Sequence, residues 1–136
     1  MKFLRLKITS DFLKTLNFDH LLKYFEEIEL LDFFHYDKNN FFTLERITIK
    51  KEYEDQWKEI IERTHKIRQF DLIKKRGNKI TAIMNISKRT GFFPLVGNEA
   101  WAIITPTTLD QKYIYINLLA PAEILPKLYE TVGKGG

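Results

Sequence analysis

Apolar and polar residues alternate with a period of two in several short segments, and this pattern constrains the fold more than any other feature. Leu4, Leu6 and Ile8 alternate with charged or aromatic residues, and the segment 79–87 repeats the pattern. Successive side chains of a strand point to opposite faces of a sheet, so the pattern predicts strands with one buried face. The predicted strands span about 3–8, 27–36, 41–50, 67–74, 79–87, 100–106 and 112–119.

Turn residues and short helical segments join these strands. Residues 37–40 and 75–78 contain Asp, Asn or Gly, which tolerate the backbone of tight turns, and each predicts a hairpin. Ser10 or Asp11 begins one short helix, and Asp19 begins a second. A longer amphipathic helix is predicted from Tyr53, Trp57, Ile60, Ile61 and Thr64, which fall at helical spacing. A final short helix lies in 121–132, with Pro126 in its first turn.

The order of these elements predicts the fold class. Residues 1–88 follow the order β-α-β-β-α-β, which is typical of α+β ferredoxin-like sandwiches with an antiparallel sheet. Residues 89–132 add a β-β-α extension or a degenerate second half-sandwich, and 133–136 form a flexible tail. The 136 residues fit a single domain that is long enough to bury a core.

Composition limits where the chain works and what chemistry it performs. Cysteine is absent, which excludes disulfides, thiolate catalysis and thiolate metal sites. No apolar run approaches the roughly 18 residues of a membrane span, and residues 1–7 alternate charge with apolar residues rather than forming a signal peptide. We therefore expect a cytoplasmic protein without membrane contact. Abundant Lys, Ile, Glu and Phe are compatible with a thermophile.

The sequence carries no recognisable catalytic or metal-binding motif. His20, His35 and His65 are scattered, without the short spacing of metal ligands. Acidic residues such as Glu52 and Glu54 fall in a predicted first helical turn, where the helix dipole favours negative charge. P-loop, dinucleotide, nucleophile-elbow and zinc patterns are all missing from the sequence. We therefore predict no enzyme, no cofactor and no metal.

The net charge of +4 is concentrated in one hairpin. Residues 66–90 hold eight basic residues against Asp71 alone, which gives +7. This charge either attracts phosphate, nucleic acid or an anionic metabolite, or it keeps an edge hairpin soluble and free of edge-to-edge pairing. The first alternative predicts a stand-alone nucleic-acid-binding protein whose contacts are Lys74, Lys75, Arg76, Lys79, Lys88 and Arg89.

Aromatic residues gather in the second part of the chain. The group comprises Phe92, Phe93, Trp101, Tyr113 and Tyr115. Such rings either line a small-molecule pocket or form the core beneath a long loop. If a pocket exists, we expect an effector to contact Arg76, Arg89, Phe92, Phe93 and Trp101.

Short motifs near both ends of the chain are shared with a known family. They are Met1–Ile8 with Asp11–Leu13, His35–Asp37 leading to Glu45–Ile47, Trp101–Pro106, Tyr113–Ile116 and Leu125–Leu128. Together they resemble the N-terminal region of archaeal helix-turn-helix transcription regulators of the bacterio-opsin activator type. The resemblance implies a regulatory domain that binds an effector or forms a homodimer. It implies DNA binding only through a helix-turn-helix module that these 136 residues do not contain.

Overall fold

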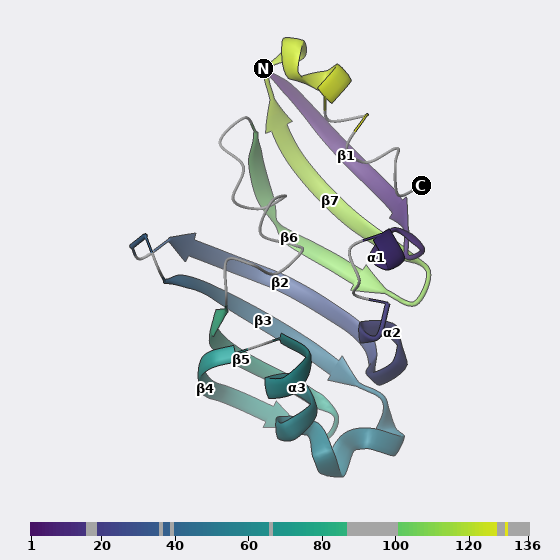
Figure 1. Cartoon of the computed structure of the whole chain (residues 1–136), viewed down its shortest axis with the longest axis vertical. Coiled ribbons are helices and arrows are strands. Elements are labelled where there is room, and N and C mark those ends of the chain that lie inside the picture. The colour runs from purple at the N-terminus through teal and green to yellow at the C-terminus, as the bar shows by residue number, and fades with distance from the viewer. Residues whose placement is uncertain are drawn as a thin grey trace.

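One antiparallel sheet of seven strands organises the part of the chain that the structure describes (Figure 1). The computed structural model describes residues 1–15, 19–35, 37–38, 40–65, 67–86, 101–127 and 130. The strands are β1 (Lys2–Thr9), β2 (Phe25–His35), β3 (Phe41–Ile49), β4 (Ile67–Arg76), β5 (Lys79–Ile86), β6 (Ala102–Asp110) and β7 (Tyr113–Ala120). Their order across the sheet is β1-β7-β6-β2-β3-β5-β4, so β1 and β4 are its edges.

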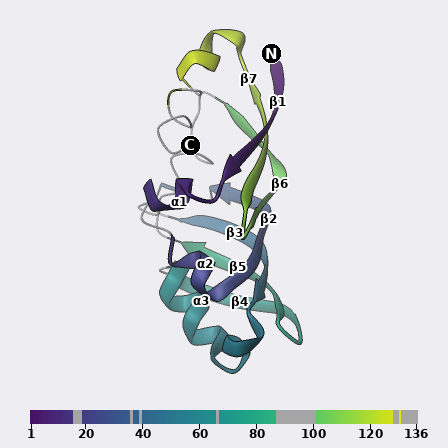
Figure 2. The same ribbon diagram turned by 90° about the vertical axis from the view of Figure 1, so that its right-hand side faces the viewer.

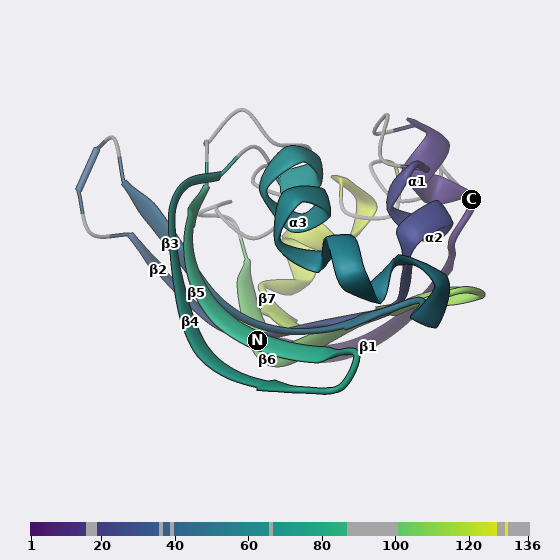
Figure 3. The same cartoon turned by 90° about the horizontal axis from the view of Figure 1, so that it is seen from below.

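The short helices that the structure describes cover one face of this sheet. The helical segments are α1 (Phe12–Thr15), α2 (Leu21–Tyr24), η1 (Lys51–Gln56), α3 (Trp57–His65) and η2 (Ala122–Ile124). The sheet is curved, and α1, α2 and α3 lie on its concave side (Figure 3). The view turned by 90° places the same three helices on one side of the sheet (Figure 2). No described helix lies on the convex side. None of the described helices is long and apolar enough to cross a membrane.

The predicted ferredoxin-like fold is wrong. Residues 102–120, predicted as an extension, form β6 and β7, which lie between β1 and β2 in the sheet. β1 pairs with β7 over eight consecutive positions, and β2 pairs with β6 through Ile28 and Leu109. A split β-α-β unit leaves room for one strand between the two strands that its helix joins. In this sheet two strands, β7 and β6, lie between β1 and β2. The segments α1 and α2 have four residues each, so β1 and β2 are not linked by a single crossover helix.

The strand positions predicted from the two-residue alternation are confirmed more closely than their arrangement. The sixth strand was predicted to end at residue 106, but β6 continues past Pro106 to Asp110. The register between β6 and β7 shifts between Ile104 and Thr108. Proline lacks the amide hydrogen that a ladder requires, and a register shift around it accommodates this loss. The amphipathic helix also differs in detail, because it starts as the 3-10 helix η1 before becoming α3.

The core lies between the concave face and the helices. Its most buried side chains are Leu13, Phe25, Phe41, Ile47, Ile49, Ile60, Ile61, Ile80, Met84, Ile114, Ile116 and Leu118. Burying one such side chain contributes about 1.5–3 kcal/mol relative to leaving it exposed. This burial fixes which face of each strand points inward. Residues of the opposite phase are therefore presented on the convex face.

Candidate nucleic-acid interface

The convex face of β1 and β7 presents aromatic, cationic and amide side chains. Leu4, Leu6 and Ile8 point toward the core, so the alternating residues of β1 point the other way. The register places Phe3 opposite Leu119, Arg5 opposite Asn117, Lys7 opposite Tyr115, and Thr9 opposite Tyr113. We call the set Phe3, Arg5, Lys7, Tyr113, Tyr115 and Asn117 the β1–β7 platform.

Two of the three platform rings, Phe3 and Tyr115, are exposed, and cations lie beside Phe3 and Tyr113. The Phe3 residue is 50% exposed and Tyr115 is 40% exposed. The Lys7 Nζ lies 4.0 Å from the ring centroid of Tyr113, and the Arg5 Cζ lies 5.6 Å from that of Phe3. Cation–π attraction at these distances holds the charged groups close to the sheet face. Rings and positive charges therefore occupy the same surface.

Neither strand of the platform carries a carboxylate. Acidic residues lie instead on β2 (Glu26, Glu27, Glu29 and Asp32) and on β6 (Asp110). Asp110 Oδ1 accepts two backbone N–H bonds of 2.8 Å from the following turn, and Glu29 Oε1 lies 3.6 Å from Arg46 Nη1. Burial, followed by the nearby charge of Glu29, raises the pKa of Glu27 above its ordinary value of 4.5. The acidic groups thus lie on β2 and β6, and none lies on the two platform strands.

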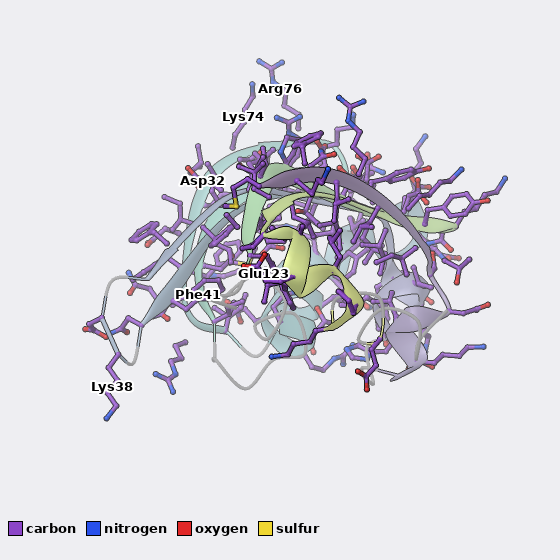
Figure 4. All side chains as sticks on the ribbon, turned by 90° about the horizontal axis from the view of Figure 1, so that it is seen from above. Asp32, Lys38, Phe41, Lys74, Arg76 and Glu123 are labelled. Atoms are coloured by element: carbon purple, nitrogen blue, oxygen red, sulfur yellow. The ribbon has the colours of Figure 1, made fainter. Side chains whose placement is uncertain are left out.

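The basic hairpin lies at the opposite edge of the sheet. Lys74 and Arg76 point away from the sheet on the side opposite the helices (Figure 4). Lys79 lies opposite Arg76 in the register between β4 and β5. Lys75 is turned toward α3, with its Nζ 5.8 Å from the Trp57 ring centroid. Lys88 and Arg89 lie outside the described residues. The four described cations keep their predicted place on one hairpin, but the large exposed side chains of β4 are the aliphatic Leu72 and Ile73 rather than rings.

The predicted effector contacts are not brought together by the described residues. Arg76 ends β4, whereas Trp101 directly precedes β6 and is only 6% exposed. Four inter-strand spacings, about 19 Å along the sheet, separate β4 from β6. Arg89, Phe92 and Phe93 lie outside the described residues. Trp101 belongs to the core, so the aromatic group predicted from the sequence divides between the core and the exposed Tyr115.

A buried polar network links α3 to the centre of the sheet. His65 Nε2 lies 3.4 Å from Glu45 Oε1, and these side chains are only 9% and 7% exposed. The Thr43 hydroxyl donates to Glu45 Oε2 at 2.6 Å, and Thr64 Oγ1 lies 2.9 Å from His65 Nδ1. Thr64 also donates to the carbonyl of Ile60 at 2.8 Å. Because the network lies inside the core, we interpret it as a fastening between helix and sheet.

The sequence contained a signal for this network and for the platform. Glu45 is in phase with the buried Ile47 and Ile49, so its carboxylate had to point into the core. Tyr113 and Tyr115 likewise alternate with Ile114 and Ile116, which places the two rings on the open face. From the sequence, His65 is only one of three scattered histidines, and the tyrosines group with Trp101.

No protein family, curated protein or solved structure was found to match this chain. The resemblance to bacterio-opsin activator-type regulators, the effector, the homodimer and the absence of catalysis therefore remain predictions. Within the described part of the chain, no three His, Asp or Glu side chains are grouped so that they could hold a metal ion.

Proposed function

We propose that this domain binds single-stranded nucleic acid on the β1–β7 platform. The observation that carries the proposal is the presence of exposed rings and cations, without a carboxylate, on two paired strands of the sheet face that no described helix covers. Bases stack on aromatic side chains, and neighbouring cations attract the phosphates, which is the usual chemistry of single-strand recognition. The proposal moves the binding surface predicted from the sequence away from the basic hairpin.

The spacing of the rings favours a single strand over a duplex. Tyr115 lies opposite Lys7, four residues along β1 from Phe3, which corresponds to about 14 Å along the strand direction. Bases in a duplex are stacked on one another and present no free faces to such rings. A single strand can splay its bases apart, so that one base stacks on Phe3 and another on Tyr115.

The positive charges divide into two groups on the same face. Arg5 and Lys7 lie in the platform. Lys74 and Arg76 on β4 lie five inter-strand spacings from β7, about 24 Å along the sheet, and Lys79 on β5 lies four spacings away, about 19 Å. A short oligonucleotide should reach only the first group, and a longer one should reach both. For single strands, the slope of the logarithm of the binding constant against the logarithm of the salt concentration is about −0.7 per neutralised phosphate. The expected slope is therefore about −1.4 for the short oligonucleotide, which reaches two cations, and about −3.5 for the longer one, which reaches all five.

Fluorescence anisotropy with labelled oligonucleotides tests the proposal. Phe3→Ala and Tyr115→Ala should each weaken binding by about 5- to 150-fold, since one base–aromatic stack contributes about 1–3 kcal/mol. Phe34→Ala is the matched control, because Phe34 is 52% exposed, stacks on Phe42 at 5.2 Å and lies outside the platform. Its affinity should equal that of the unmodified protein. Unchanged affinity in both platform variants would refute the assignment, as would an equal loss in the control.

A further inference from the structure

Strand β4 forms one edge of the sheet, and β1 forms the other. It spans ten residues, whereas strands of about five or six residues are typical. Among the described strands it pairs only with β5, so the backbone N–H and C=O groups on its outer side receive no partner from the sheet. Eight of its ten residues are exposed. A long, accessible edge of this kind is a template for the addition of another strand.

The side chains along this edge differ between its two faces. Lys74 and Arg76 lie two residues apart and project on the side opposite the helices (Figure 4). Leu72 lies opposite the buried Ala82, which places it on the concave side, and it is exposed. Ile73 is also exposed and lies at the register shift, where no residue of β5 is opposite it. The edge therefore presents cations on its convex side and accessible aliphatic groups beside them.

The charges of this edge disfavour pairing with a second copy of the chain. β4 carries four basic residues and one acidic residue, which gives a net charge of +3. β1 carries three basic residues and no acidic one, which also gives +3. Pairing β4 with either edge of another copy would place two such strands side by side, and like charges on neighbouring strands are destabilising. The cations that keep copies apart are complementary to an acidic strand.

We propose that β4 binds an extended acidic segment of another protein, which adds to the sheet as a further strand. Backbone hydrogen bonds give such additions their affinity, and alternate side chains give them specificity. Carboxylates at every second position would meet Lys74 and Arg76 on the convex side. Aliphatic residues between them would cover Leu72 on the other face. The partner is thus a segment in which acidic and aliphatic residues alternate, and its site lies at the far edge of the sheet from the β1–β7 platform.

A labelled peptide in which glutamate alternates with valine tests the proposal by fluorescence anisotropy. The protein should bind this peptide and should not bind the same peptide with lysine in place of glutamate. Lys74→Glu combined with Arg76→Glu should weaken binding of the glutamate peptide about tenfold or more, because two attractions become repulsions. Lys58→Glu combined with Lys112→Glu is the matched control, since it changes the net charge equally at two exposed lysines outside β4. Its affinity should equal that of the unmodified protein.

Methylation of the peptide backbone separates strand addition from simple charge attraction. The amides of an added strand point alternately toward the neighbouring strand and away from it. N-methylation of one alternate set of amides should therefore abolish binding, whereas methylation of the other set should leave it unchanged. Equal effects of the two sets would overturn the proposal, as would equal losses in the β4 variant and in the control variant.

One further variant and one further measurement identify the occupant of the edge. Leu72→Ser combined with Ile73→Ser should weaken peptide binding about fivefold, because aliphatic area is no longer buried. Amide hydrogen exchange should be slowed by the peptide in β4. Slowing in β1 instead, or no peptide binding by the folded protein at low salt, would overturn the proposal. It would also be overturned if this variant lost oligonucleotide binding, which would assign the edge to nucleic acid, or dissolved a dimer of the chain, which would assign it to a second copy.

Discussion

Replacing Glu45 by alanine is expected to cost about 2–6 kcal/mol of unfolding free energy, because it leaves two buried polar groups without a partner. The Thr43 hydroxyl would lose its 2.6 Å acceptor, and His65 Nε2 would lose the oxygen 3.4 Å away. Each buried polar group left without a partner costs about 1–3 kcal/mol. The two losses together give a value in the same range. A domain of this size has a total stability of only about 5–15 kcal/mol.

Urea denaturation followed by circular dichroism measures this cost. Arg46→Ala is the matched control, since Arg46 is the next residue of the same strand but lies on the convex face in a partly exposed pair with Glu29. Exposed pairs contribute about 0–1 kcal/mol, so this variant should remain close to the unmodified protein. A double-mutant cycle with His65→Gln should show a coupling energy above about 0.5 kcal/mol. A Glu45→Ala loss below 1 kcal/mol, or no larger than that of Arg46→Ala, would refute the role of the network.

Two further predictions concern a carboxyl group at the border of the platform and the turn of the basic hairpin. Because the pKa of Glu27 is raised on folding, its contribution to stability is fully present below pH 4.5 and is lost as pH rises through the raised value. Denaturation at a series of pH values should show that Glu27→Gln removes this dependence. Gly77 has a φ of +56°, and an added Cβ would lie 3.7 Å from Glu54 Oε1, an ordinary contact. Gly77→Ala should therefore cost about 1–2 kcal/mol through its backbone alone, and Gly77→Asn should cost less; equal melting temperatures for all three proteins would contradict this.

One part of the candidate site could be predicted from residues that are close together along the chain, whereas the other part depends on residues that are far apart. The phase of β1 was readable from Leu4, Leu6 and Ile8, so the opposite orientation of Phe3 and Arg5 followed from the sequence. Nothing in the sequence placed these residues beside Tyr115 and Asn117, which lie more than 100 positions later. The basic hairpin was found from charge alone, because its cations are close together along the chain. The aromatic platform was missed because its two halves are far apart along the chain.

The sequence by itself determined where the strands lie and which of their side chains point inward. That information is local, because alternation of apolar residues requires only that one face of each strand be buried. The tertiary structure decided which strands are neighbours, and it placed β7 and β6 between β1 and β2. Several antiparallel pairings satisfy the same alternation, and the choice among them depends on how all the strands pack together against the short helices. That choice assembled the β1–β7 platform on the convex face, where no described helix lies.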